Sequence, residues 1–305
     1  MTSGNGLIWA DGTVIDAQAA TVPVLSHGLQ RGSTVFDVLR VVDLDDGPAA
    51  FGLRPHIVRF LASMDLMGMA RPYSVAELET AVATAVLANP GATIVKCVAA
   101  WAEEAPSLLP ESLRPSVWVA TLPAPDKGPE VLSLMASEVP KIPAALLPPG
   151  LKVAAAYTPG VRAQLAARSA GFDGVVLRAQ DGTLAEGVTQ SVFVVQGGRL
   201  RVPALDTVLD GITRRAVLEV AHDMGITAEI RPVRWEEVEA ADELFLSSTN
   251  GPVRPIGRLD DRTLDAPGPV TTQLLHAVDR LLAGDHRRSG AWLTPLAPLV
   301  ETRAA

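Results

Sequence analysis

The stretch LKVAAAYTP, residues Leu151 to Pro159, carries a lysine and a tyrosine in a chain that is poor in both. The whole sequence of 305 residues holds four lysines and two tyrosines, and Tyr157 lies five residues after Lys152. A lysine in an alanine-rich segment can bury its methylene stem while its ammonium stays in solvent. Alternatively, the amine is present because it does chemistry, and the rest of the chain bears on that choice.

Three segments downstream of Lys152 place polar groups next to predicted strands or helices. In GTLAEGVTQSVFVV (182–195), Glu186 follows a turn and precedes an apolar strand. In DGITRR (210–215), Gly211 to Thr213 precede a predicted helix, whose first backbone N–H groups suit a phosphate. In LFLSSTNGP (244–252), a strand runs into the turn Ser248–Gly251, where small residues let a ligand approach the backbone.

A lysine, an isolated glutamate and phosphate-holding turns are the groups that pyridoxal phosphate requires. The lysine amine forms a Schiff base with this cofactor, and desolvation lowers the pKa of such an amine. The carboxylate pairs with the pyridine nitrogen and keeps it protonated, so that the ring withdraws electrons. Each piece also has a plain interpretation, since Gly211–Thr213 can be an ordinary helix start and Glu186 an ordinary turn residue.

The order of these pieces resembles the class IV aminotransferases. The chain reads Lys-x-x-x-x-Tyr, then Glu-Gly-x-x-x-x-x-Phe, then Gly-Ile-Thr-Arg, then Ala-Asp-Glu-Leu-Phe-Leu-x-x-Thr. The segments LSHGLQRGSTVFDVLRV (25–41), HIVRF (56–60) and GAWL (290–293) extend the likeness over nearly the full chain. This family comprises pyridoxal-phosphate enzymes of fold type IV. It includes branched-chain and D-amino acid aminotransferases, (R)-amine transaminases and aminodeoxychorismate lyase.

The resemblance implies a role for each matching residue. Lys152 matches the catalytic lysine that carries the cofactor as a Schiff base, and Glu186 the carboxylate at the pyridine nitrogen. Tyr157 matches the tyrosine near the phenolic oxygen of the cofactor. The positions that match the phosphate cradle and its neighbour are Arg59, Ile212, Thr213, Ser248 and Thr249. Arg59 has a second interpretation, as an exposed helix arginine.

Departures from the family pattern fall mostly on the substrate side. Branched-chain members typically have a tyrosine at the position of Arg31 and an arginine at that of Lys96. Ala100–Trp101 stands where D-amino acid enzymes have an Arg-Gly strand that traps a carboxylate. Near the cofactor, Ala156 and Ser191 each replace a common asparagine, which removes a hydrogen-bonding group but leaves the core chemistry intact.

The substrate expectation rests on two cations in a chain with only 4% aromatic residues. A buried cation without a partner is costly, so Arg31 and Lys96 favour a carboxylate ligand. We therefore expect a D-amino acid or (R)-amine as donor and an α-keto acid such as 2-oxoglutarate or pyruvate as acceptor. The alternatives are a branched-chain L-amino acid enzyme and, less favoured, a lyase of the aminodeoxychorismate type.

The same cations have two further interpretations, namely binding of the side-chain carboxylate of L-glutamate and a salt bridge with Asp37 or another acid. The expected substrate-binding residues are Arg31, Phe36, Lys96, Asn250 and Gly251.

The chain is expected to form an α+β fold of two domains. These are a small N-terminal α/β domain (1–122), a linker (123–134) rich in proline and charge, and a larger cofactor-binding domain (135–305) with a mixed, barrel-like sheet. Apolar periodicity predicts helices, and Ser74 and Glu77 form a capping box. The helices are expected at 56–69, 74–89, 161–171, 212–225 and 270–284. Strands are expected at 7–15, 34–53, 92–102, 116–125, 174–182, 191–203 and 228–235, with a helix leading into a strand at 236–248.

Composition narrows the remaining classes. The formal net charge is −8 and no run of Lys or Arg occurs, which argues against nucleic acid as a partner. One cysteine, Cys97, excludes an intrachain disulfide and a cysteine-based zinc site, and no metal is expected. Neither a signal peptide nor the roughly 20 apolar residues needed to span a bilayer is found. We expect a cytoplasmic enzyme that makes no membrane contact, and the family resemblance implies a homodimer.

Overall fold

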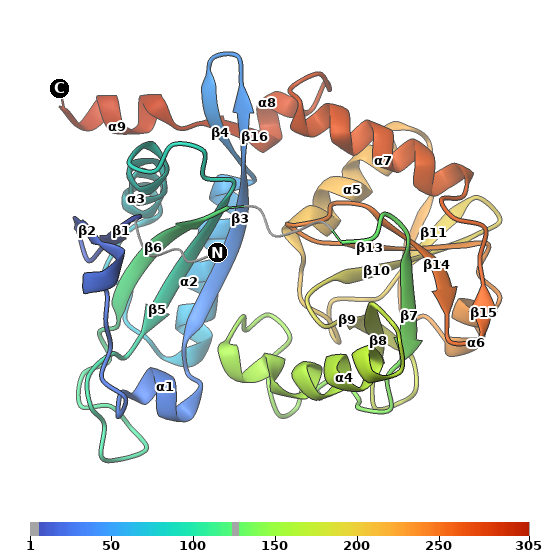
Figure 1. Ribbon diagram of the computed structural model, residues 1–305, viewed down its shortest axis with the longest axis horizontal. Helices are drawn as coiled ribbons and strands as arrows, with labels where there is room; N and C mark the ends of the chain where they lie inside the picture. Colours follow the sequence, from blue (N-terminus) through green and yellow to red (C-terminus); the bar gives the residue numbers. More distant parts are fainter. Residues whose placement is uncertain (1–5, 124–127, 305) are drawn as a thin grey trace. The chain divides into compact units, whose positions relative to one another are not determined.

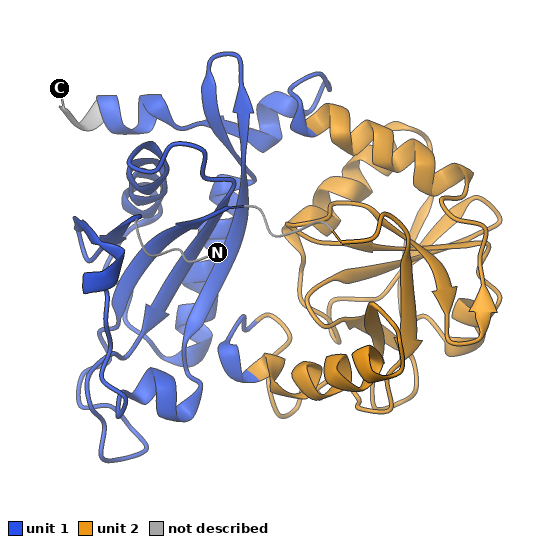
Figure 2. Cartoon of the chain, in the orientation of Figure 1, with its two compact units in different colours: residues 1–125, 151–155, 282–305 blue, residues 126–150, 156–281 orange. Residues whose placement is uncertain are grey.

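The computed structural model describes residues 6–123 and 128–304 (Figure 1). The chain forms two compact units, coloured separately in Figure 2. Unit 1 comprises Met1–Pro125, Leu151–Ala155 and Leu282–Ala305, and unit 2 comprises Asp126–Gly150 and Ala156–Leu281.

Unit 1 is built on a seven-stranded antiparallel sheet with the order β16-β4-β3-β5-β6-β1-β2. Strand β3 alternates strictly, so that Val35, Asp37, Leu39 and Val41 are buried while the residues between them are half-buried. This period of two is what a strand with one core-facing side requires. The strands are β1 (Leu7–Ala10), β2 (Thr13–Asp16), β3 (Val35–Leu44), β4 (Gly47–Phe51), β5 (Ile94–Ala100), β6 (Ser116–Leu122) and β16 (Leu293–Pro295).

The helices of unit 1 are led by α2 (Leu53–Met67) and α3 (Val75–Leu87). Helix α2 buries Ile57, Phe60, Leu61 and Met64, the residues whose helical spacing predicted it. The capping box at Ser74 is confirmed, because its hydroxyl and the Glu77 carboxylate each accept from the other's backbone N–H. The shorter helices are η1 (Ala17–Ala19), α1 (His27–Arg31), α8 (Ser289–Trp292) and α9 (Ala297–Ala304).

Unit 2 holds a nine-stranded mixed sheet with the order β12-β11-β10-β13-β14-β7-β8-β9, and β15 pairs with β14. Three of its strand pairs are parallel, namely β11/β12, β14/β7 and β7/β8. The strands are β7 (Leu132–Ala136), β8 (Gly174–Arg178), β9 (Leu184–Gly187), β10 (Ser191–Gln196), β11 (Arg199–Val202), β12 (Ala228–Ile230), β13 (Glu243–Ser247), β14 (Arg254–Leu259) and β15 (Arg262–Thr263).

The unit 2 sheet packs on two apolar clusters. The larger one is centred on β10, β13 and β14 and contains Val192, Leu244 and Ile256. The smaller one joins α4 to β8 and contains Ala163 and Val175. The helices are η2 (Ala154–Tyr157), which begins in unit 1, α4 (Thr158–Ser169), α5 (Ile212–Asp223), α6 (Trp235–Glu239) and α7 (Pro269–Leu282).

The α+β architecture of two units is confirmed, but the boundaries differ from the expected domains. Residues 282–305 belong to unit 1, because β16 pairs with β4 and Leu296 donates its N–H to the Pro48 carbonyl. Leu151–Ala155 also belongs to unit 1. Of the expected linker, residues 124–127 lie outside the described residues, and its end is already strand β7.

Candidate active site

Lys152 lies in a short extended segment that continues the pairing of β3. The Phe36 N–H donates to the Lys152 carbonyl at 3.1 Å, and the Ala154 N–H donates to the Thr34 carbonyl at 2.8 Å. The Lys152 N–H donates to the Ser63 hydroxyl on α2 at 3.1 Å. These bonds explain why the lysine segment is part of unit 1, and they fix its backbone from both the sheet and the helix.

Two lysine ammonium groups lie at the ring of Phe36. Lys96 Nζ is 4.9 Å from the ring centroid and Lys152 Nζ is 4.8 Å from it. A cation within about 6 Å of an aromatic face is attracted by the ring quadrupole. Phe36 thus gathers the candidate catalytic lysine and a candidate substrate-binding lysine. Arg31 ends the short helix α1 and is exposed.

Beneath β3, a buried carboxylate holds the candidate phosphate arginine. Asp37 is fully buried, and Arg59 donates to it through Nε and Nη2, each at 2.8 Å. His56 Nδ1 lies 2.7 Å from Asp37 Oδ1. Burial alone would raise the pKa of Asp37, but Arg59 and His56 outweigh burial and hold it well below its ordinary value. Burial also lowers the pKa of His56, so at neutral pH a neutral His56 donates through Nδ1–H.

This cluster bears on two expectations. Arg59 is not an exposed helix arginine, since only 10% of its side chain is accessible. Asp37 is paired with Arg59 and His56 rather than with Arg31 or Lys96. Within the described residues, no carboxylate forms an ion pair with either of those two cations. The salt-bridge interpretation of Arg31 and Lys96 is therefore not seen.

In unit 2, Glu186 is a buried carboxylate with two donors. It lies on β9 and is 8% exposed. The ammonium of Lys141 contacts its Oε1 in a short charged hydrogen bond, and the Leu209 N–H donates to its Oε2 at 3.3 Å. An isolated buried carboxylate would be unfavourable, and these two donors compensate for it.

The turn before α5 has the geometry of an anion cradle. Gly211 is the N-cap of this 12-residue helix, and no side chain caps the first N–H groups. Ile212 and Thr213 are both buried. A Cβ at Gly211 would lie 2.8 Å from the Ser191 hydroxyl oxygen and 3.2 Å from Arg214 Cβ, so the position requires glycine. Such a helix start binds phosphate through its backbone N–H groups and dipole.

The second candidate turn follows β13. The Ser248 N–H donates to the Gly251 carbonyl at 3.0 Å, and the Gly251 N–H donates to the Ser248 hydroxyl at 3.3 Å. Gly251 is buried against Arg254, whose Cγ would lie 2.5 Å from an added Cβ. Thr249 is half-buried and Asn250 is exposed in this turn. Tyr157, at the end of η2, is half-buried.

The predicted residues thus fall into two groups, one in each unit. The unit 1 group is Arg31, Phe36, Arg59, Lys96 and Lys152, and the unit 2 group is Tyr157, Glu186, Ile212, Thr213, Ser248, Thr249, Asn250 and Gly251. Sequence reasoning missed three polar neighbours of these groups, namely Asp37, His56 and Lys141. The spacing of His56 and Arg59 on one helix face could have indicated the first cluster, whereas nothing local marks Lys141 as a partner of Glu186.

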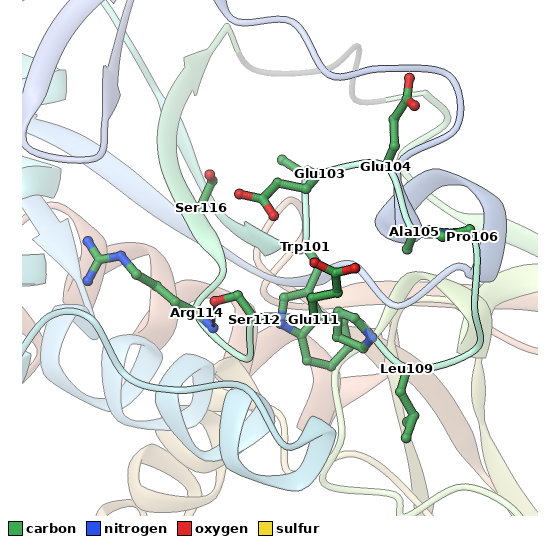
Figure 3. Close-up of a pocket in the computed structure, with 12 residues that line it drawn as sticks. Trp101, Glu103, Glu104, Ala105, Pro106, Leu109, Glu111, Ser112, Arg114 and Ser116 are labelled. Atoms are coloured by element: carbon green, nitrogen blue, oxygen red, sulfur yellow. Dashed lines mark hydrogen bonds between the residues drawn. The ribbon is translucent and has the colours of Figure 1, made fainter.

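A separate pocket in unit 1 lies in the segment that joins β5 to β6. Figure 3 shows Trp101 with Glu103 and Glu111 beside it and Arg114 to one side. His27 braces this segment, because its ring packs edge-on against Trp101 and its Nε2 lies 2.8 Å from the Leu108 carbonyl oxygen. None of the predicted site residues lines this pocket. Over residues 6–123 and 128–304, no helix is long and apolar enough to cross a membrane, and no His/Cys/Asp/Glu cluster could hold a metal ion.

Comparison with known proteins identifies the family. A model of the amino-transferase class IV family matches residues 34–259. The chain belongs to this family. The branched-chain-amino-acid aminotransferase of Pseudomonas aeruginosa is 30% identical over 302 residues, which cover 96% of this chain and 98% of that protein. That of Salmonella typhimurium is 26% identical and covers 95% of this chain and 97% of that protein.

Solved structures agree with the fold. The branched-chain aminotransferase of Thermoproteus uzoniensis with norvaline superimposes with a TM-score of 0.92 at 31% identity, over 96% of this chain and 100% of that one. A second branched-chain aminotransferase, from T.th. and complexed with N-(5'-phosphopyridoxyl)-L-glutamate, gives 0.91 at 29% identity, over 96% and 99%. This class IV aminotransferase is a fold type IV enzyme that uses pyridoxal phosphate. Its lysine, its buried carboxylate and its uncapped helix start fit that cofactor chemically.

Proposed function

We propose that the enzyme transfers the amino group of branched-chain L-amino acids to 2-oxoglutarate. The observation that carries this proposal is the agreement of its relatives over nearly their full length, which are named branched-chain aminotransferases. One of the similar structures contains a phosphopyridoxyl derivative of L-glutamate, and another contains 4-methylvaleric acid, an apolar branched acid. These findings support the alternative stated from the sequence better than the favoured D-amino acid or (R)-amine substrate.

The proposed cofactor roles follow from the residues of this chain. Pyridoxal phosphate, when bound, supplies an electron-withdrawing ring that acidifies the hydrogen on the substrate Cα. Lys152 attaches the cofactor and then moves a proton with the same amine. Glu186 accepts a hydrogen bond from the ring nitrogen, and Tyr157 lies near the phenolic oxygen. The phosphate is bound by Arg59, Ile212, Thr213 and Thr249, with Ser248 as a neighbour.

The substrate-side cations suit an enzyme that accepts both apolar and acidic side chains. Lys96 lies against the same Phe36 ring as Lys152, so its ammonium is close to the catalytic amine. The Ala155 N–H donates to the Gly32 carbonyl at 3.1 Å, which ties the residue after Arg31 to the lysine segment. We therefore assign Lys96 and Arg31 to the side-chain carboxylate of L-glutamate and 2-oxoglutarate. Asn250 and Gly251 are assigned to the substrate α-carboxylate.

Arg31→Ala and Lys96→Ala test this assignment. Loss of one charge-assisted hydrogen bond costs roughly 1.5–3 kcal/mol, so KM for 2-oxoglutarate and L-glutamate should rise about ten- to a hundredfold. KM for L-leucine should be nearly unchanged, because its side chain carries no charge. Arg54→Ala, which removes an exposed arginine of α2, is the matched control.

Two other outcomes of these variants are informative. If Arg31→Ala instead impairs D-alanine or D-glutamate and spares the L series, the cations bind the α-carboxylate of D-substrates. If neither amino acid series responds, Arg31 and Lys96 are structural and the substrate-side assignment fails.

We also propose a homodimer. Unit 1 exposes a group of large apolar side chains around α1 and the segment between β5 and β6. Val24 is 72% exposed, Leu29 61%, Leu108 73% and Leu109 75%. A monomer rarely leaves such a group in solvent without an interaction partner. Sedimentation should give a dimer for the wild type and a monomer for Leu108→Asp/Leu109→Asp; a wild-type monomer would refute the proposal.

A further inference from the structure

Lys141 has a fixed backbone in an irregular part of unit 2. It lies between two prolines in the segment that follows β7, and its N–H donates to the Arg178 carbonyl at the end of β8 at 2.9 Å. Just beyond it, the N–H groups of Leu146 and Leu147 both donate to the Pro143 carbonyl. The chain therefore presents the Lys141 side chain from an anchored position.

The Lys141 side chain ends on the carboxylate of Glu186. The side chains of the two residues are 20% and 10% exposed, so the ion pair is largely withdrawn from solvent. Lys141 occupies Oε1, while the Leu209 N–H occupies Oε2. Removing one partner of such a pair leaves an uncompensated buried charge, which is strongly unfavourable. Among the described residues, Lys141 is the only cation that pairs with this carboxylate.

This pair bears on the cofactor because Glu186 is the residue assigned to its ring nitrogen. An ionised carboxylate has about four acceptor positions, so two donors leave capacity for the ring N–H. A neighbouring ammonium favours the ionised form of the carboxylate, and the ionised form is the one that binds a protonated ring nitrogen. We propose that Lys141 is a positioning residue that keeps Glu186 ionised and oriented for the ring nitrogen of the cofactor.

The inference deepens the proposed role of Glu186 and is tested by cofactor binding rather than by turnover. Apoenzyme is titrated with pyridoxal phosphate and with its deaza analogue, which has C–H in place of the ring nitrogen. Lys141→Met should bind pyridoxal phosphate about tenfold more weakly, equivalent to about 1.4 kcal/mol. Its affinity for the deaza analogue should equal that of the wild type, because that analogue offers Glu186 no N–H.

Three further variants complete the design. Lys141→Arg keeps the positive charge and should bind both ligands as the wild type does. Lys141→Met in a Glu186→Gln background should add little to the effect of Glu186→Gln alone, since the residue acts through that carboxylate. Arg231→Met, which breaks the half-exposed ion pair with Glu237 in the same unit, is the matched control. The double variant also keeps the test open should Lys141→Met alone fail to fold, because it removes both buried charges.

Two results would overturn the inference. The first is wild-type affinity of Lys141→Met for pyridoxal phosphate. The second is equal weakening toward both ligands, which would make Lys141 a structural residue only. Failure of the Glu186 assignment is distinguishable, because Glu186→Gln would then bind both ligands as the wild type does.

Discussion

Lys152 is one of only four lysines, and each competitor can be separated from it by chemistry. Its ammonium lies against Phe36 and its backbone is tied to β3 and α2. Borohydride reduction of the holoenzyme and peptide mapping should place the phosphopyridoxyl group on Lys152. Lys152→Ala should still bind cofactor but lose almost all transamination. A label on Lys96, Lys127 or Lys141 would invalidate the site assignment.

Asp37 should make the stability of the enzyme sensitive to acid. Because its pKa in the folded protein is depressed, its ion pair contributes fully above its unfolded pKa of about 4 and is lost as pH falls further. Asp37→Asn should cost about 3–5 kcal/mol at pH 7, since Arg59 then keeps a largely buried charge without its counter-ion. Thermal unfolding of the two apoenzymes should show that this difference shrinks below about pH 4. A difference that stays constant down to pH 3 would contradict this role.

At the level of residues, the sequence predicts the groups that do chemistry but not the groups that hold them. Lys152 and Glu186 stand in ordered motifs with fixed spacing, so the family resemblance finds them. The contacts of Asp37 with His56 and of Lys141 with Glu186 join positions that are 19 and 45 residues apart. Such pairs arise from tertiary packing, which no local pattern encodes.

The start of α5 is the element whose geometry most directly implies phosphate binding. Gly211→Ala places a methyl group against Ser191 and Arg214, so the turn must shift. Affinity for pyridoxal phosphate should fall about tenfold, or about 1.4 kcal/mol, while that for pyridoxal, which lacks the phosphate, should change little. Gly290→Ala is the matched control, because an added Cβ there meets nothing within 4 Å. Equal losses for both ligands would show that the variant harms the fold rather than the phosphate cradle.

Elements with a strong internal signal were predicted well, and elements that depend on a distant partner were not. The spacing of Ile57, Phe60 and Leu61 and the capping box at Ser74 located α2 and α3. Strand β16 has three residues and includes Pro295, so only its pairing with β4 defines it. For the same reason the C-terminal residues were expected in the larger domain, whereas they belong to unit 1.

For the whole molecule, the family and cofactor are established and the substrate is the open question. The two cations of unit 1 pointed toward a D-substrate, whereas the relatives are branched-chain enzymes. The two interpretations use the same residues because Arg31 and Lys96 could bind either carboxylate of a substrate. Residue types alone therefore do not distinguish them, and the stereochemistry of the accepted substrate does.

A panel of half-reactions decides between these interpretations most directly. Holoenzyme is mixed with a single amine donor and no keto acid, and the absorbance of the lysine-bound cofactor is followed. L-leucine and L-glutamate should each convert the cofactor to its amine form, whereas D-alanine and an (R)-amine should leave its absorbance unchanged. Conversion by D-alanine or the (R)-amine without conversion by L-leucine would contradict the proposed branched-chain L-amino acid aminotransferase.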